Sequence, residues 1–154
     1  MSPRTKIGAL VLSFAGGLAI LGYEGYSDQA IQPLPGDKWT IGYGTTEGVK
    51  PGDKITPPSA LRRAAKDIAK KENAVKKCIT APLYQHEYDA YVSLAYNIGE
   101  GAFCSSTLVK KVNQLDYAGG CAEISRWDKF KGKPNKGLAV RRAQERATCE
   151  GRNI

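Results

Sequence analysis

The sequence predicts an α+β domain that is mainly helical and carries a small β-hairpin near its N-terminus. Apolar residues recur at helical spacing through most of the chain after residue 57, whereas Trp39–Tyr43 has the composition of a strand. No internal repeat, low-complexity tract or long linker interrupts the 154 residues, a length at which one domain buries a real core. One helix-rich domain with an early hairpin is the architecture that these observations favour.

The hairpin is predicted from turn residues on one side of the strand. The stretch 33–37, Pro-Leu-Pro-Gly-Asp, is rich in turn formers and stands between Ala30–Gln32 and Trp39–Tyr43. We expect these two short runs to pair across the turn.

Helices are predicted over the rest of the chain. Pro57 and Pro58 precede a segment in which Leu61, Ala65, Ile68 and Val75 fall on one helical stripe. Further helices are expected over 84–99, which has few charges and is predicted to be central and buried, and over 105–115, 117–127 and 138–149, with a loop at 128–137.

The N-terminal segment Ile7–Gly22 has no charged residue and follows Arg4 and Lys6. It is shorter than the roughly 20 apolar residues of a spanning helix, and its glycines weaken it further. A cleaved signal peptide would need a clean small-residue cleavage site, which is missing. A marginal membrane anchor and a buried first helix both remain compatible with this composition.

The charge balance indicates a polyanionic partner. Lysine and arginine number 23 against 15 acidic residues, which gives a net charge of +8. The basic residues are scattered, and no nucleic-acid-binding motif accompanies them, so nucleic acid is not expected as a partner.

Four cysteines, Cys78, Cys104, Cys121 and Cys149, are widely spaced. They suit two disulfides in an exported domain, and four buried thiols in a reducing compartment are the alternative. His86 is the only histidine, which leaves too few ligands at metal spacing for a zinc site. Neither a metal nor a cofactor is expected.

Glu24 is the first candidate for chemistry. An apolar helix directly before it would partly desolvate the carboxyl group, favouring the protonated form that general acid catalysis uses. Taken alone, the residue would more often be a surface acid. The hairpin strengthens the case, because it could present Asp37 or Thr40 to the same cleft.

Several motifs then show a resemblance to a known family. GYEGYSD, WTIGYGTT, AYNIGEGAF-x-SSTL, SRW and GL-x-x-RR-x-x-E follow one another through nearly the whole chain. In this order they resemble phage endolysins of the T4-lysozyme-like class, glycoside hydrolase family 24. The resemblance implies a lysozyme-like fold with an N-terminal β-hairpin lobe and a helical C-terminal lobe. It also implies a lysozyme that cleaves the β-1,4 bond between N-acetylmuramic acid and N-acetylglucosamine in peptidoglycan and lyses the host cell at phage release. Glu24 matches the catalytic glutamate of that family, and Thr40 matches its catalytic threonine.

The hairpin departs from the family pattern of Glu, eight residues, Asp or Cys, five residues, Thr. The ninth residue after Glu24 is Pro33, and the sixth before Thr40 is Leu34, so neither count reaches an acid. We expect Asp37 to act as a shifted substitute, with Asp28 as a weaker candidate. The resemblance implies a cleft near Tyr43, Asn97 and Gly99, and a structural role for Arg141 and Arg142.

With the family in view, the N-terminus resembles that of signal-anchor-release endolysins. Residues 1–22 are then expected to be a signal-anchor segment that doubles as the first helix, and residues 23–154 the catalytic domain. The enzyme would wait inactive in the host inner membrane, tethered through residues 7–22, and act in the periplasm after release, as a monomer. Cys104 with Cys121, as the ends of an antiparallel helix pair, and Cys78 with Cys149 are the expected disulfides.

Two alternative functions remain compatible with the sequence. A lytic transglycosylase would cleave the same bond without water and needs only a glutamate, which suits the missing acid. A membrane-tethered basic protein without catalysis would account for the charge and the N-terminal segment alone, although no basic cluster lies beside aromatic residues.

Overall fold

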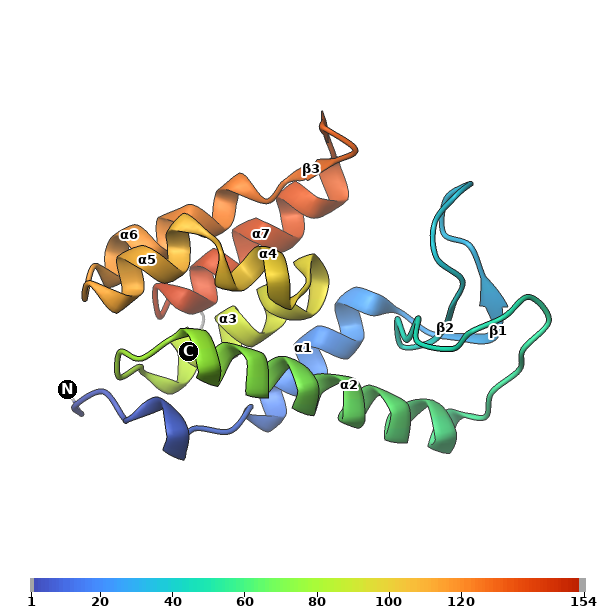
Figure 1. The fold of residues 1–154 in the computed structure, drawn as a ribbon, viewed down its shortest axis with the longest axis horizontal. Helices are drawn as coiled ribbons and strands as arrows, with labels where there is room; N and C mark the ends of the chain where they lie inside the picture. Colours follow the sequence, from blue (N-terminus) through green and yellow to red (C-terminus); the bar gives the residue numbers. More distant parts are fainter. Residues whose placement is uncertain (1, 153–154) are drawn as a thin grey trace.

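The computed structural model describes residues 2–152 and has two lobes. Figure 1 shows a helical lobe that holds both ends of the chain and a smaller lobe built around one hairpin, with a long helix running between them. The predicted mainly helical α+β class is confirmed.

The described residues form the following elements in chain order: η1 (Ile7–Ala9), α1 (Phe14–Glu24), β1 (Ser27–Ile31), β2 (Thr40–Gly42), α2 (Pro57–Cys78), α3 (Gln85–Ile98), α4 (Glu100–Cys104), α5 (Thr107–Asn113), α6 (Tyr117–Glu123), η2 (Ile124–Arg126), β3 (Lys129–Phe130), β4 (Lys133–Pro134) and α7 (Lys136–Cys149). The predicted loop 128–137 therefore contains a minimal second hairpin, β3–β4.

The small lobe is the antiparallel pair of β1 and β2. Ser27 pairs with Gly42 and Ile31 with Thr40, so β1 holds more residues than β2 between the same two pairings. Such a bulge bends a strand and re-aims the residues beyond it.

The helix α2 connects the lobes. Its first half buries Ala60 and Ala64, and its second half buries Ala74 and Val75 in the helical lobe. The predicted stripe was wrong in its first half, where Leu61 is 47% exposed. The first half of α2 packs on β2, and small side chains allow that close approach, so alanine rather than leucine faces inward there.

The core of the helical lobe surrounds α3, as its sparse charges predicted. Residues 87–95 of this helix are all buried, and α1, α2, α4 and α7 pack around it. Among the largest fully buried side chains of this core are Tyr88, Tyr91 and Phe103. Burial on every side fixes α3 in place, so residues at its C-terminal end have a rigid support.

The expected disulfide pairing was wrong. The structure pairs Cys78 with Cys104 and Cys121 with Cys149, with Cα–Cα distances of 5.5 and 5.6 Å. Helix α5 intervenes between Cys104 and Cys121 and packs on α6, so the assumed antiparallel pair does not form. Instead α4 ends beside the last turn of α2, and α6 lies beside the last turn of α7.

The first helix is shorter than predicted. It begins at Phe14 rather than Ile7, because the Ser13 hydroxyl accepts a hydrogen bond from the Gly16 amide at 3.0 Å and caps the helix. Ser13 itself is held by the Asp89 carboxylate of α3. Within residues 2–152 no helix combines the length and the apolar character needed to cross a membrane.

Candidate active site

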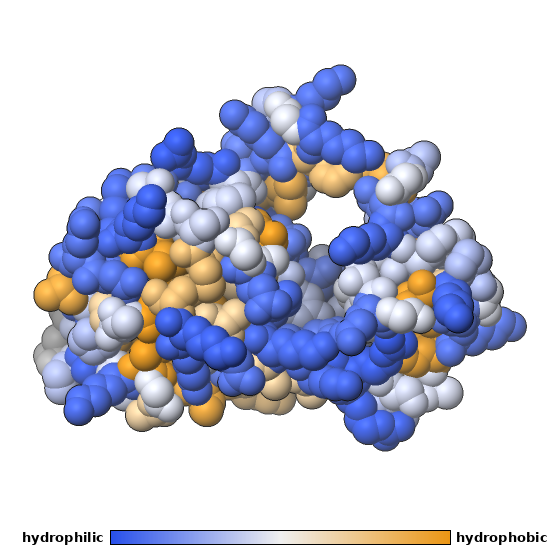
Figure 2. Space-filling model, viewed as in Figure 1, coloured by the Kyte–Doolittle hydropathy of each residue, from blue (hydrophilic) through white to orange (hydrophobic). Residues whose placement is uncertain are grey.

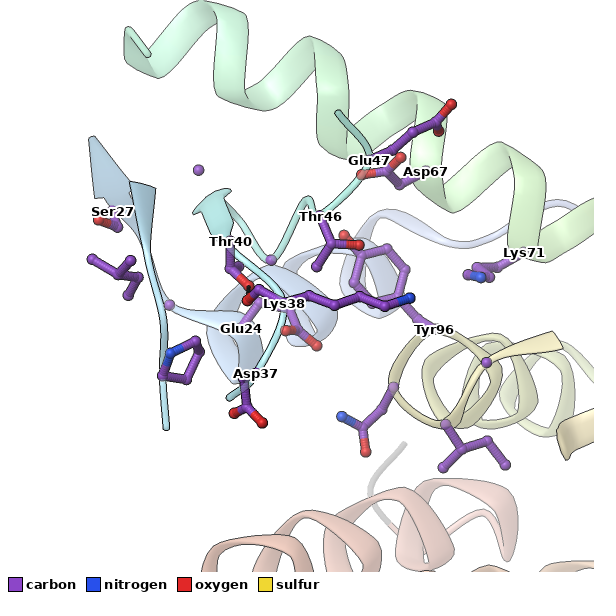
Figure 3. Close-up of a pocket in the computed structure, with 18 of the residues that line it drawn as sticks. Glu24, Ser27, Asp37, Lys38, Thr40, Thr46, Glu47, Asp67, Lys71 and Tyr96 are labelled. Atoms are coloured by element: carbon purple, nitrogen blue, oxygen red, sulfur yellow. Dashed lines mark hydrogen bonds between the residues drawn. The ribbon is translucent and has the colours of Figure 1, made fainter. Parts of the chain in front are cut away.

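A cleft of about 930 Å³ separates the two lobes. Figure 2 shows the molecule hollowed at this point, with hydrophilic residues below and to the right of the opening and hydrophobic ones at its upper left. The hairpin forms one wall, α2 and the end of α3 form the other, and Glu24 lies between them at the end of α1 (Figure 3).

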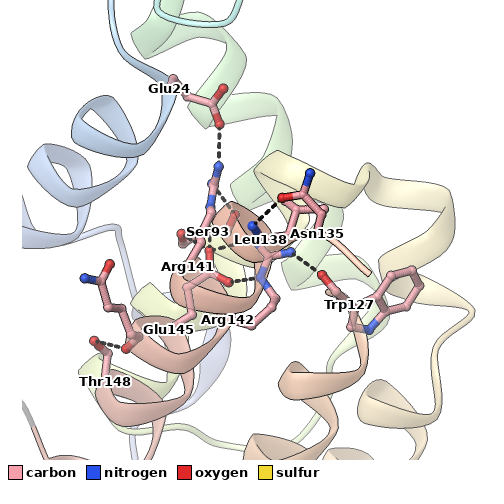
Figure 4. Close-up of polar contacts among 10 residues, drawn as sticks. Glu24, Ser93, Trp127, Asn135, Leu138, Arg141, Arg142, Glu145 and Thr148 are labelled. Atoms are coloured by element: carbon pink, nitrogen blue, oxygen red, sulfur yellow. Dashed lines mark hydrogen bonds and ion pairs between the residues drawn. The ribbon is translucent and has the colours of Figure 1, made fainter. Parts of the chain in front are cut away.

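Glu24 is the last residue of α1, and Gly25 ends the helix with a φ of +66°. Its side chain is 19% exposed. The Arg141 guanidinium of α7 donates to Oε1 of Glu24 at 2.8 Å, as Figure 4 shows. The carboxylate is therefore held by a contact between residues 117 positions apart.

Arg141 is itself fixed by the helical core. Its Nε donates to Glu145 at 3.0 Å, its Nη2 donates to the Ser93 carbonyl at 3.3 Å, and its guanidinium lies 4.6 Å from the Tyr23 ring centroid. The side chain is 8% exposed. Arg141 therefore presents a fixed donor to Glu24 rather than a mobile surface charge.

The other oxygen of Glu24 lies against the turn after β2. A side chain at Gly44 would place its Cβ 2.6 Å from Oε2, which is closer than any real contact, and Gly44 has a φ of +82°. Only glycine meets both conditions, so the turn backbone can approach the carboxylate closely.

The hairpin side of the cleft carries Asp37 and Thr40. Asp37 belongs to the turn before β2, where its amide donates to the Leu34 carbonyl at 3.0 Å and its carbonyl accepts from Gln32. Thr40 begins β2, and its hydroxyl donates to the Lys38 carbonyl at 3.2 Å. Both residues border the same cleft as Glu24 (Figure 3).

Asp28, the weaker candidate, is exposed on β1 and is not among the residues that line the cleft. Asn97 and Gly99 line it, at the end of α3. Tyr43 packs on the Tyr26 ring at 5.2 Å between centroids.

Charged side chains of both signs line the outer cleft. Lys70 forms an ion pair with Glu47, and its hydrogen bond lowers the pKa of the Glu47 carboxyl group. Figure 3 shows Lys38 reaching from the hairpin across the cleft toward Tyr96 of α3. An extended polar chain with carboxylate and amide groups would find both donors and acceptors here.

Three residues of this site escaped the sequence analysis. Arg141 was assigned only a structural role, and Tyr96 and Asp67, which line the cleft, were not singled out. Each belongs to a predicted helix, and its local sequence gives no sign of a role beyond forming that helix. Only the folded chain brings them beside Glu24 or its neighbouring turn.

Within residues 2–152 no metal site accompanies the cleft. Among the residues that the structure describes, no three His, Cys, Asp or Glu side chains lie close enough together to hold an ion.

Known proteins resemble the chain over almost its full length. The phage lysozyme family model matches residues 22–145. An endolysin of Acyrthosiphon pisum secondary endosymbiont phage 1 is 43% identical over 143 residues, covering 90% of this chain and 97% of that protein. A SAR-endolysin of Pseudomonas phage phiKMV is 35% identical over 153 residues, covering 97% and 92%. The solved endolysin from Escherichia coli O157:H7 phage FAHEc1 superposes with a TM-score of 0.82 at 36% identity, covering 92% and 94%.

The fold, the cleft and these matches define a class, that of lysozyme-like enzymes that degrade peptidoglycan. Within this class the chain belongs to the phage lysozyme family and is a phage endolysin. The resemblance seen in the sequence motifs is confirmed.

Proposed function

We propose that this endolysin is a muramidase that hydrolyses the β-1,4 bond between N-acetylmuramic acid and N-acetylglucosamine, with Glu24 as its general acid. The observation that carries the proposal is the position of Glu24, whose carboxylate lies in the cleft between the lobes with only one oxygen committed to a cation. A glycan strand passing through the cleft would present its glycosidic oxygens to the other carboxylate oxygen of Glu24.

The ion pair decides which oxygen of Glu24 delivers the proton. A guanidinium only donates hydrogen bonds, so Oε1 must remain an acceptor for Arg141. The acidic proton is then carried by Oε2, which faces the Gly44 turn and the cleft. When the proton passes to the leaving oxygen, Arg141 stabilises the carboxylate that results.

Hydrolysis also needs a water held on the opposite face of the sugar. Thr40 donates its proton to the Lys38 carbonyl, so its oxygen is available as an acceptor for a water hydrogen. Asp37 lines the cleft from the same hairpin and supplies the carboxylate that would take the proton of the water. Thr40 and Asp37 are proposed to position and activate this water together.

Lysis of permeabilised Gram-negative cells tests the role of Glu24. Glu24→Gln should lower the rate about 10²- to 10⁴-fold, the usual contribution of a general acid. Glu100→Gln is the matched control, because it changes a second glutamate that lines the cleft and should keep the wild-type rate. Full activity of folded Glu24→Gln would rule out this mechanism.

A lytic transglycosylase is the second candidate, favoured by one feature. The family position for an acid holds Pro33, and Asp37 lies in an exposed turn. Mass spectrometry of the products separates the two reactions, because hydrolysis leaves a hydrated reducing end and transglycosylation a 1,6-anhydro sugar.

We further propose that residues 7–22 first tether the enzyme in the host inner membrane and that their release into the periplasm completes the active fold. Release would let residues 4–22 dock as an arm on α2 and α3. Arg4 donates two hydrogen bonds to the Glu87 carboxylate, at 3.0 and 2.8 Å, and lies between the rings of Tyr84 and Tyr117. The Leu12 amide donates to Glu72 at 2.6 Å.

These contacts support a two-state segment, because the acceptors are acids of the catalytic body. Glu87 is 2% exposed and Asp89 is 9% exposed. If the arm were in a bilayer, both carboxylates would lose partners that the folded state gives them. Docking of the arm also places α1, and therefore Glu24, beside the cleft.

Cell fractionation and N-terminal sequencing test the release. The protein should be found first in the inner membrane and later in the periplasm, with its N-terminus intact. Arg4→Lys keeps the positive charge but loses the two-pronged hydrogen bond, so it should tether normally and lyse cells more slowly after release. A purely cytosolic protein, or a mature form starting after Gly22, would contradict this proposal.

A further inference from the structure

Tyr96 joins the two lobes at the back of the cleft. It lies near the C-terminal end of α3, and its hydroxyl donates to the Tyr43 carbonyl of the small lobe at 3.0 Å. Burial raises the pKa of this hydroxyl well above its ordinary value, so it stays protonated and remains a donor around neutral pH. The hydrogen bond links the rigid core to the turn after β2.

That link fixes the peptide unit that leads into Gly44. The Tyr43 carbonyl and the Gly44 amide belong to one planar group, so a bond to the carbonyl sets the plane of the whole unit. The turn is closed by paired backbone hydrogen bonds between Ile41 and Thr45, at 3.0 and 3.1 Å. The Thr45 hydroxyl donates to Asp67 of α2 at 2.7 Å. Two helices therefore hold the turn: α3 contacts it at Tyr43, and α2 contacts it at Thr45.

The held turn is the surface against which Glu24 rests. An ideal Cβ at Gly44 would lie 2.6 Å from Oε2, so there is no room for a side chain between the turn backbone and the carboxylate. Arg141 holds Oε1 from the other side at 2.8 Å. A small shift of the turn would therefore open room for the carboxyl group to rotate around its contact with Arg141.

We propose that Tyr96 is a positioning residue for catalysis: by holding the Tyr43–Gly44 peptide, its hydroxyl keeps Oε2 of Glu24 aimed into the cleft. In this role the Tyr96 hydroxyl acts through the turn, by its hydrogen bond to the Tyr43 carbonyl. The inference rests on the proposed role of Glu24 as general acid. The proposed function belongs to the Tyr96 hydroxyl group and is separate from the packing of the Tyr96 ring in the core.

Tyr96→Phe isolates this hydroxyl, because it keeps the ring and removes one oxygen. Displacing a reacting group by about 1 Å costs on the order of 10²-fold in rate, so we expect kcat on purified peptidoglycan to fall about 10- to 100-fold. KM should stay near the wild-type value, since the aromatic ring that lines the cleft is kept. The limb of the pH–kcat profile that belongs to Glu24 should also move, which a purely structural hydroxyl would not cause.

Tyr117→Phe is the matched control. Its hydroxyl also donates to a backbone carbonyl of another segment, that of Pro82 at 2.9 Å, but it lies outside the cleft. Both variants should lose a similar amount of thermal stability, and only Tyr96→Phe should lose kcat. If Tyr96→Phe and Tyr117→Phe have the same kcat and pH profile, the proposal is overturned.

A second variant keeps the test decisive if Tyr96→Phe folds poorly. Thr45→Val loosens the same turn from the α2 side by removing the hydrogen bond to Asp67. It should reproduce the loss of kcat at unchanged KM, and wild-type kcat in this variant would count against the proposal. Glu24→Gln separates a failure of the proposed function from a failure of the proposed role of Tyr96. An active Glu24→Gln removes the proposed function itself, whereas an inactive Glu24→Gln beside a fully active Tyr96→Phe removes only the role of Tyr96.

Discussion

The two sides of the cleft hold their acids in different ways. Glu24 is held at one oxygen by Arg141 of α7, and its other oxygen faces the Gly44 turn, which Tyr96 ties to α3. Asp37 is held within its own hairpin, where its amide donates to the Leu34 carbonyl and its carbonyl accepts from the Gln32 side chain. One acid is fixed by the core, and the other by a local, exposed turn.

This difference implies a division of labour. The proton donor must meet the glycosidic oxygen in one orientation, and a rigid support provides this. The group that positions water tolerates more freedom, because the water itself can adjust between partners. Changes on the core side should therefore affect stability and activity together, whereas changes in the hairpin should affect activity alone.

Arg141→Met should have the largest effect and would break the rigid side. It leaves Glu24 without its cation and removes a donor from the buried Glu145, and the loss of one partner of such a pair typically costs about 3–5 kcal/mol. We expect the free energy of unfolding in urea to fall by about this amount, with lysis nearly abolished. A folded variant of wild-type stability would mean that Arg141 is not part of the core network.

Loss of either disulfide should come next. The bonds close loops with sequence separations of 26 and 28, for which chain entropy predicts about 3–4 kcal/mol each. Cys78→Ser with Cys104→Ser and Cys121→Ser with Cys149→Ser should lower the melting temperature by similar amounts, because the loops are similar in length. Reduction with dithiothreitol that leaves the melting temperature unchanged would show that the bonds are not formed in solution.

The sequence predicted the features that depend on local pattern. The helices, the hairpin and Glu24 at the end of an apolar helix follow from spacing, turn residues and capping, and the structure contains them. The start of the first helix was missed because Ser13 is held by Asp89, a residue of α3 that no local pattern connects with it. The cap itself is local, but the hydrogen bonds that hold Ser13 to Asp89 depend on the tertiary fold.

Long-range partners could not be predicted for the same reason. The disulfide pairs depend on which helix lies beside which, and α5 changed that order. Arg141 and Tyr96 look like ordinary helix residues in the sequence, and their contacts with Glu24 and Tyr43 span 117 and 53 positions. The catalytic roles of Glu24, Asp37 and Thr40 remain predictions.

Asp37→Asn tests the exposed side of the cleft. If Asp37 activates the water, lysis should fall about 10²-fold or more, as for loss of a general base. The free energy of unfolding should change by less than about 0.5 kcal/mol, because surface substitutions without buried partners rarely change it further. Asp28→Asn is the matched control on the same hairpin, outside the cleft, and should lyse cells normally. Lysis near the wild-type rate in a folded Asp37→Asn would remove this residue from the mechanism.

Arg146→Met should have the smallest effect and sharpens the contrast with Arg141 on the same helix. Arg146 pairs with Glu150 at 2.7 Å on the surface, where solvent screening limits such pairs to about 0–1 kcal/mol. The hydrogen bond from Arg146 lowers the pKa of the Glu150 carboxyl group. The contribution is therefore present above the unfolded pKa of a glutamate and is lost as the pH falls through the lowered folded value. Urea unfolding at neutral pH should show a small difference between wild type and Arg146→Met, and acidification should remove it. If Arg146→Met lowered the free energy of unfolding as much as Arg141→Met, burial and contact with Glu24 would not explain the effect of Arg141.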